Sequence, residues 1–198
     1  IGISGIDTRT ITAHIRDHGM FNAILAHAPD AEFDIPALQA ELDKFAGLEG
    51  ADLAAEVTSQ TAYEWNQTRW EWNQGFSEND PKTQGMPHVV ALDYGVKKNI
   101  LRCLAQAGCR VSVVRASASA EEILAQNPDG IFLSNGPGDP AATGEYAVGE
   151  IKKLVASGKP VFGICLGHQM LARALGAKTV KMKQGHHGAN HPVKDLTT

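Results

Sequence analysis

Val161-Phe-Gly-Ile-Cys-Leu-Gly-His-Gln169 joins residues suited to a buried strand directly to a cysteine, a glycine turn and the start of a helical pattern. A side chain at such a sharp strand-to-helix turn is lifted off the backbone, at the sheet edge where ligands bind. The helix that follows stabilises a thiolate at its amino end, and the thiolate is the nucleophilic form of cysteine. Gly163 and Gly167 reduce the crowding around the turn. The stretch therefore favours Cys165 as a nucleophile that attacks a carbonyl over a buried structural cysteine.

The chain around this stretch alternates four times between short apolar strands and helices. The predicted strands are 88–93, 110–114, 131–134 and 161–164, and the predicted helices are 98–107, 119–126, 146–156 and 166–175. Short, uniformly apolar strands separated by helices are typical of a parallel sheet covered on both faces. We therefore expect an α/β fold with a doubly wound, mostly parallel sheet.

The residues ahead of this pattern indicate a second, smaller domain. Residues 74–87 are polar, hold two glycines and two prolines and lack periodicity, which predicts a linker between a domain at 1–73 and one at 88–198. We expect a helix from Asp7 or Thr8 to Gly19, a strand at 21–26 and a helix at 36–45, together an α+β domain. Crowded aromatic residues predict an aromatic hairpin or an edge packed on the neighbouring domain: Tyr63, Trp65, Trp70 and Trp72.

The composition is that of an ordinary globular protein. The net charge of −4 comes without a dense basic cluster, which argues against nucleic-acid binding, and no apolar run approaches the roughly 20 residues that span a bilayer. Three cysteines in unpaired spacing favour a reducing compartment, so we expect a cytoplasmic protein with Cys103 and Cys109 as small buried fillers. The chain starts at Ile1 and stops at Thr198 without terminal features, so we expect a piece of a longer protein.

A second loop with unusual content, Ser134-Asn-Gly-Pro-Gly-Asp-Pro140, follows the strand at 131–134. Gly136 and Gly138, held between prolines, can turn backbone N–H groups toward a ligand. Together with the N–H of Leu166, such donors would suit a developing oxyanion. A tight strand-to-helix connection explains the loop equally well, and no Gly-Lys-Ser/Thr follows that would make it a phosphate loop.

The histidines offer no convincing general base. His168 lies on the new helix and is expected to point away from the thiol. His186, His187 and His191 lie in a loop with glycines and a proline, where shaping of the loop or contact with a neighbouring chain is a better interpretation than metal binding. His14 and His18 share a helix face without a carboxylate between them. We therefore expect no metal in this chain, and because it has no phosphate loop we also expect no cofactor.

Five segments resemble the class I (triad-type) glutamine amidotransferases, and more narrowly the small, glutaminase chains of carbamoyl-phosphate synthetases. The cysteine motif and the Ser134 loop mark the superfamily; the narrower resemblance rests on Lys181-Met-Lys-Gln-Gly-His-His-Gly188 with Asn190-His-Pro192, Leu92-Asp-Tyr-Gly-Val-Lys-Lys-Asn-Ile100 and Gly5-Ile-Asp-Thr-Arg9.

The resemblance implies a flavodoxin-like fold and a cysteine glutaminase. Cys165 would attack the side-chain amide of L-glutamine through a glutamyl thioester, and Gly136, Gly138, Leu166 and Gln169 would contact the glutamine or its oxyanion. Ammonia would pass to a large partner chain that binds ATP with its metal ions and makes carbamoyl phosphate for arginine and pyrimidine synthesis. The family's catalytic His and Glu would lie beyond Thr198, so this piece alone is expected to hydrolyse glutamine slowly or not at all.

Three other functions fit parts of the sequence. A glutaminase of the anthranilate or GMP synthetase type would deliver ammonia to a different acceptor enzyme. A non-catalytic scaffold would gate a synthetase, although the presence of Cys165 argues against it. A cysteine peptidase or stress protein on a similar scaffold would leave the segment at 181–188 unexplained.

Overall fold

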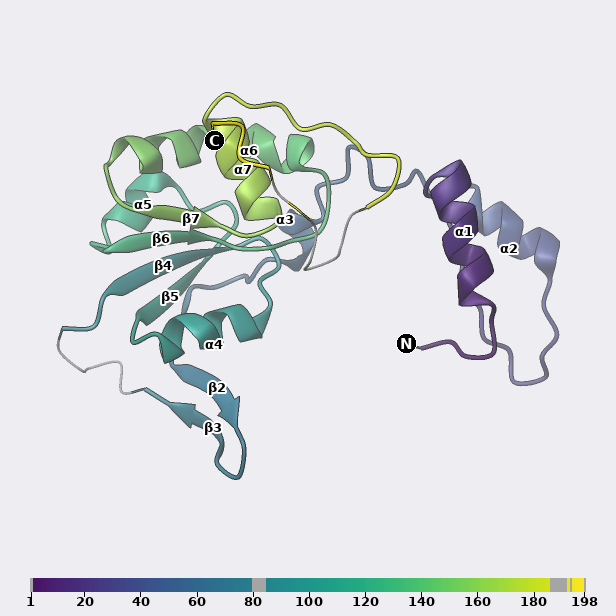
Figure 1. Cartoon of the computed structure of the whole chain (residues 1–198), viewed down its shortest axis with the longest axis horizontal. Helices are drawn as coiled ribbons and strands as arrows, with labels where there is room; N and C mark the ends of the chain where they lie inside the picture. The colour runs from purple at the N-terminus through teal and green to yellow at the C-terminus, as the bar shows by residue number, and fades with distance from the viewer. Residues whose placement is uncertain (1, 80–84, 186–191, 193, 198) are drawn as a thin grey trace. The chain divides into compact units, whose positions relative to one another are not determined.

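The computed structural model describes residues 2–79, 85–185, 192 and 194–197. Their contacts divide the chain into two compact units (Figure 1). The larger unit is Leu48–Thr179, and the smaller one combines Ile1–Gly47 with Val180–Thr198. This division differs from the boundary predicted at 74–87, because residues after Gly47 already pack with the main sheet.

The larger unit is built on a five-stranded sheet in the order β1-β5-β4-β6-β7. The strands are β1 (Tyr63–Trp65), β4 (His88–Asp93), β5 (Arg110–Arg115), β6 (Gly130–Leu133) and β7 (Val161–Gly163). The last four are parallel, and β1 is antiparallel to β5. The strand order reverses between β4 and β6, as in flavodoxin-like sheets, where ligands bind beyond the carboxyl ends at that point. The predicted α/β fold class is confirmed.

Helices cover both faces of this sheet (Figure 1). One face carries α4 (Lys98–Gln106); the other carries α5 (Ala120–Leu124), α6 (Pro140–Ala156) and α7 (Leu166–Ala174). Successive strand residues point to opposite faces, so Val90 and Leu92 pack under α5, α6 and α7 while Ala91 packs with Leu101 of α4. Two apolar cores therefore hold the carboxyl edge of the sheet in place.

The helix ends follow local capping chemistry. A capping box opens α5: the Glu122 N–H donates to Ser119 Oγ at 3.1 Å, and the Ser119 N–H donates to Glu122 Oε2 at 2.7 Å. Helix α6 begins at Pro140, well before the predicted start at Tyr146. Asp139 accepts the Ala141 N–H at 2.8 Å, and proline is favoured at a first helical position.

A two-stranded hairpin joins β2 (Gln67–Glu71) to β3 (Gly75–Glu78), so the predicted linker begins as a strand. Trp65 packs against the core that includes α4, whereas Trp70 and Trp72 are exposed, with ring centroids 5.6 Å apart. The predicted aromatic hairpin is thus present, whereas the edge strand β1 that carries Trp65 belongs to the same unit as the sheet and not to a neighbouring domain. A short helix, α3 (Ala54–Val57), precedes them.

The smaller unit contains α1 (Thr8–His18) and α2 (Ile35–Leu42). Asp7 caps α1 by accepting the Thr10 N–H at 2.9 Å, and Gly19 ends it, as predicted. The strand predicted at 21–26 is wrong. An extended segment becomes a strand only when a neighbouring strand takes up its backbone N–H and C=O groups, and none of the described residues of this unit pairs with it.

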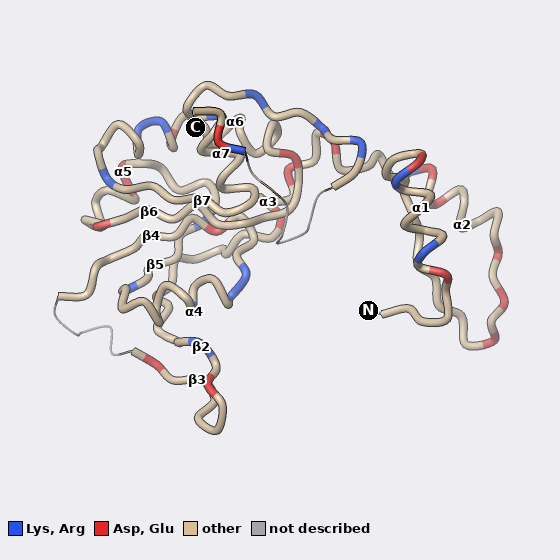
Figure 2. Tube along the Cα trace, in the orientation of Figure 1, with Lys and Arg blue, Asp and Glu red and all other residues tan. Residues whose placement is uncertain are grey.

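Cys103 is exposed, so its prediction as a buried filler is wrong: the buried face of α4 is formed by Leu101 and Ala105. Cys109 is half-buried, and burial raises its pKa. Acidic and basic residues are interspersed along the chain (Figure 2). No described helix is long and apolar enough to cross a membrane.

Candidate active site

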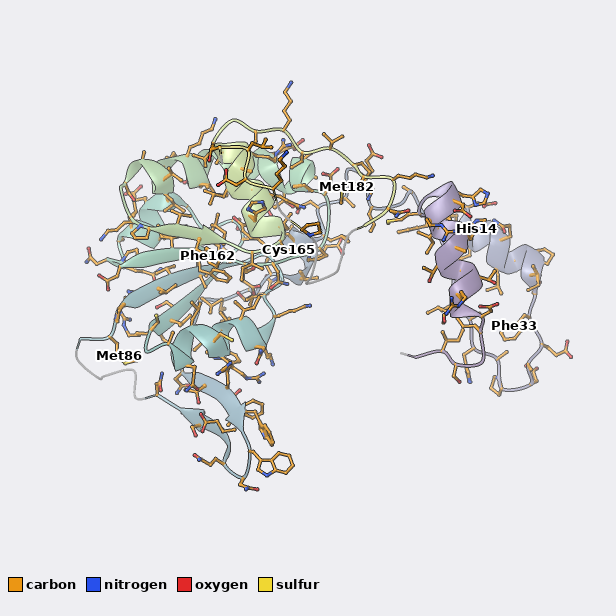
Figure 3. All side chains as sticks on the ribbon, in the orientation of Figure 1. His14, Phe33, Met86, Phe162, Cys165 and Met182 are labelled. Atoms are coloured by element: carbon orange, nitrogen blue, oxygen red, sulfur yellow. The ribbon has the colours of Figure 1, made fainter. Side chains whose placement is uncertain are left out.

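Cys165 occupies the sharp turn between β7 and α7 that the sequence predicts (Figure 3). Its backbone has φ 54° and ψ −113°, and its side chain is exposed. A positive φ is uncommon for a residue other than glycine and costs about 1–3 kcal/mol, so it persists only where the surrounding structure enforces it. The Ile164 N–H, which donates to the Leu133 carbonyl at 3.1 Å, fixes the chain just before the turn.

The flanking glycines are required by close backbone packing. A Cβ on Gly163 would lie 2.6 Å from the carbonyl carbon of Gly167, and one on Gly167 would overlap the carbonyl oxygen of Leu133. Any larger residue would push α7 away from β6 and β7. The two glycines therefore set the height at which Cys165 stands above the sheet edge.

The Ser134 loop leaves the same edge beside this turn. Leu133 is in register with Gly163 in the parallel pair β6–β7, so the residues that follow each strand emerge side by side. The Gly167 N–H donates to the Ser134 carbonyl at 3.0 Å. This bond ties the amino end of α7 directly to the start of the loop.

The same loop is anchored at the strand-order reversal by the residues that follow β4. Ser134 Oγ accepts the Tyr94 N–H at 2.9 Å. The Asn135 side chain donates to the Gly95 carbonyl at 2.9 Å and accepts the Lys97 N–H at 3.0 Å. Gly136 packs so closely that a Cβ there would overlap the Tyr94 carbonyl. The loop is therefore rigidly positioned.

Gly138 and Asp139 fasten the far end of the loop to the segment before α3. Gly138 has φ 95°, and a Cβ there would lie 2.7 Å from the Ala51 carbonyl oxygen. The Asp139 N–H donates to Ala51 at 2.9 Å, and Asp139 Oδ2 accepts the Gly50 N–H at 2.9 Å. Sequence reasoning missed this support, because the contacts join residues that are far apart in the chain.

The structure thus gathers the predicted site residues on two adjoining loops. Leu166 is the first residue of α7, and among the described residues its N–H has no acceptor, which leaves it available to an oxyanion. Gln169 is exposed one turn along the helix, and its N–H donates to the Cys165 carbonyl at 3.0 Å. Gly136 and Gly138 lie on the neighbouring loop. Their contacts with substrate stay predictions.

A base for Cys165 is not found in the described part of the chain. His168 is exposed on α7 and forms no hydrogen bond with the Cys165 thiol. His186, His187 and His191 lie outside the described residues. Within the described ranges, no group of three or more His, Cys, Asp or Glu side chains could hold a metal ion. The described residues thus place the exposed Cys165 thiol beside the amino end of α7 and the Ser134 loop, and the nucleophile and oxyanion roles stay predictions.

Comparison with protein families matches residues 90–198 to glutamine amidotransferase class-I. Over its whole length the chain is 62% identical to the carbamoyl phosphate synthase small chain of Caulobacter vibrioides, covering 50% of that protein. It is 64% identical to the protein of the same name from Rhizobium meliloti, covering 49% of it. The chain therefore spans about half the length of these curated relatives. The solved structure of a proposed GMP synthase protein from Thermoplasma acidophilum aligns with 56% of this chain and 52% of its own at 25% identity and a TM-score of 0.44.

Proposed function

Because this chain belongs to the class-I glutamine amidotransferase family, we propose that it forms part of the glutaminase subunit of a glutamine-hydrolysing carbamoyl phosphate synthase. The observation that carries the proposal is the exposed Cys165 at its strained turn, beside a rigid loop of glycines. The curated relatives named carbamoyl phosphate synthase small chain support the choice of this synthase over other amidotransferases.

In the proposed reaction, the Cys165 thiolate attacks the side-chain amide carbon of L-glutamine. The carbonyl electrons move to the oxygen and form a tetrahedral oxyanion. When the C–N bond breaks, the nitrogen takes up a proton and leaves as ammonia, and a glutamyl thioester remains on Cys165. Water then attacks the thioester, releases glutamate and returns the thiol.

The described residues support the charged step of this reaction. The N–H of Leu166, which no described residue accepts, belongs to the first turn of α7, where the helix dipole also favours negative charge. We assign the second donor to the backbone of the Gly136–Gly138 loop, whose anchoring by Tyr94 and Ala51 keeps it from moving as charge develops. Gln169 would contact the bound glutamine.

The proposal extends to a partner. Ammonia would pass to a large subunit that binds ATP and its metal ions, in the cytoplasm, and that makes carbamoyl phosphate for arginine and pyrimidine synthesis. The general base of the reaction would come from outside the described residues.

The test is glutamate release from glutamine by the full-length protein, alone and with its large partner, in the presence and absence of ATP and bicarbonate. We expect slow release that rises sharply only when partner, ATP and bicarbonate are all present. Release that is indifferent to this partner would indicate another amidotransferase. No release under any condition would leave a non-catalytic scaffold.

A further inference from the structure

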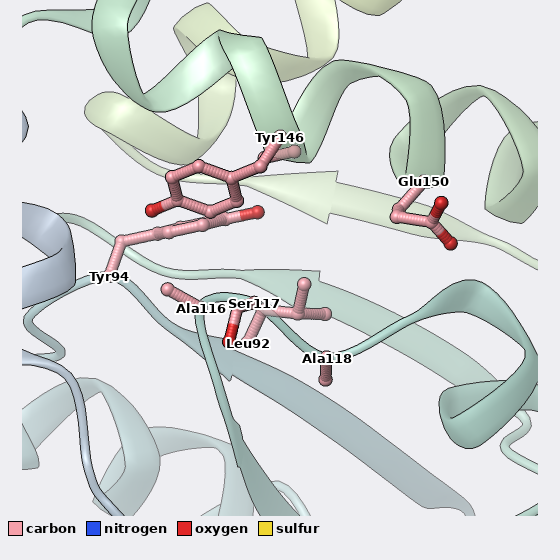
Figure 4. A pocket seen from close by; sticks show the side chains of 8 residues that line it. Leu92, Tyr94, Ala116, Ser117, Ala118, Tyr146 and Glu150 are labelled. Carbon is pink, nitrogen blue, oxygen red and sulfur yellow. The ribbon is translucent and has the colours of Figure 1, made fainter.

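A small cavity lies beside Tyr94, the residue after β4 against which Gly136 packs. It has a volume of about 40 Å³ and is bounded by the end of β4, the turn after β5 and one side of α6 (Figure 4). Its walls are mostly apolar, formed by Leu92 and by alanines at 116, 118 and 147. The remaining lining residues carry polar groups: Tyr94, Ser117, Tyr146 and Glu150.

Tyr94 brings a hydroxyl into this cavity. Its side chain is 0% exposed, and its Oη has no hydrogen-bonding partner among the described residues. Burial is the main cause that raises the pKa of Tyr94, so the hydroxyl keeps its proton and can both donate and accept. A buried hydroxyl left without any partner is costly and rare in native proteins.

Glu150 offers acceptors at the other end of the cavity (Figure 4). Its Oε2 accepts the Ala120 N–H at 2.7 Å, and its Oε1 accepts Lys153 Nζ at 2.7 Å. An ionised carboxylate has about four acceptor positions, so about two stay open. Ser117, which is exposed, also lines the cavity.

The volume fits a particular occupant. One water molecule needs about 10–15 Å³ of such space and about two to four polar partners, so a cavity of about 40 Å³ has room for roughly three. A purely apolar cavity of this size would stay dry, but this one has a donor at one end and acceptors at the other.

We propose that the cavity is a binding site for a short chain of ordered water molecules that connects the Tyr94 hydroxyl to the Glu150 carboxylate. These water molecules would hold Tyr94 at its hydroxyl, while its backbone N–H donates to Ser134 Oγ of the Ser134 loop. The Tyr146 side chain lies next to that of Tyr94 with its hydroxyl directed the other way (Figure 4), and among the described residues that buried hydroxyl also has no hydrogen-bonding partner. Burial is the main cause that raises the pKa of Tyr146 to about 12, and the nearby charge of the Asp52 carboxylate is the second.

The test uses the full-length protein and the variant Tyr94→Phe, which removes the hydroxyl and keeps the ring. If water binds the hydroxyl, this variant breaks the chain and lowers the melting temperature by about 2–4 °C. If the hydroxyl is dry, the same variant removes an unsatisfied polar group and leaves the melting temperature unchanged or higher. Tyr63→Phe, at an exposed tyrosine on β1, is the matched control and should change nothing.

A high-resolution crystal structure of the unmodified protein is the second, independent test. Ordered density within hydrogen-bonding distance of Tyr94 Oη, continuing toward Glu150, supports the proposal. A cavity without such density overturns it, as does a Tyr94→Phe variant that melts no lower than the unmodified protein.

Discussion

Gly167→Ala tests the close packing on which the position of Cys165 depends. The added Cβ would overlap the Leu133 carbonyl and lie 2.7 Å from the Leu133 Cβ, whereas real Cβ contacts stay beyond 3.0 Å. Because the obstacle is mainly backbone, helix α7 must move, at a cost of about 1–3 kcal/mol. That movement also lengthens the 3.0 Å bond from the Gly167 N–H to Ser134, worth about 0.5–1.5 kcal/mol. The total is about 1.5–4.5 kcal/mol of unfolding free energy, or a fall in melting temperature of roughly 3–18 °C.

The assay combines thermal denaturation with glutamate release. A displacement of about 1 Å at the nucleophile is expected to lower kcat/KM about a hundredfold. Gly149→Ala is the matched control: this glycine lies inside α6 with open space at its Cβ, so alanine should raise the unfolding free energy by about 0.5–1 kcal/mol. A Gly167→Ala protein with unchanged stability and activity would refute the packing argument.

Three further predictions follow from local geometry and charge. Cys165→Gly should abolish activity and raise the unfolding free energy by about 1 kcal/mol, because glycine adopts the positive φ without strain. Cys165→Ala should abolish activity without that gain in stability. Equal stabilities of the two variants would contradict backbone strain at Cys165. Asp139→Ala should cost about 1–2 kcal/mol in denaturant unfolding, since the carboxylate caps α6 and binds the Gly50 N–H. Burial is the main cause that lowers the pKa of His88 from its ordinary 6.5, so the unfolded chain binds a proton at this residue more readily than the folded chain. The unfolding free energy should therefore fall as the pH drops below 6.5. His88→Gln should flatten this pH dependence in denaturation curves measured across pH.

The larger unit could be predicted closely because its signals are local. Uniformly apolar strands, the Ser119 capping box and the glycines around Cys165 each specify their own segment, and the structure follows them. The Asp139-Pro140 pair is also a local signal for the start of α6, but the first turns of this helix lack apolar periodicity, so the helix was predicted to begin later. The exposure of individual side chains was harder to predict, as Cys103 shows, because the position of the sheet decides which face of α4 is buried.

Features that depend on distant residues could not be predicted. The segment at 21–26 has strand-forming residues, yet a strand forms only where a partner strand meets it, and the chain order alone did not show this. The support of Gly138 by Ala51 and of Gly136 by Tyr94 joins segments far apart in sequence. The cavity between Tyr94 and Glu150 arises in the same way, from strand order and helix placement.

The most direct test of the central claim is mass spectrometry of the Cys165 peptide after the full-length protein, with its large partner, is mixed with glutamine and quenched in acid. The proposed chemistry predicts a glutamyl adduct on Cys165 that appears with glutamine, decays as glutamate is released and is lost in Cys165→Ser. Glutamate release at the normal rate in Cys165→Ser, or an adduct on another residue, would contradict the assignment of Cys165 as the nucleophile.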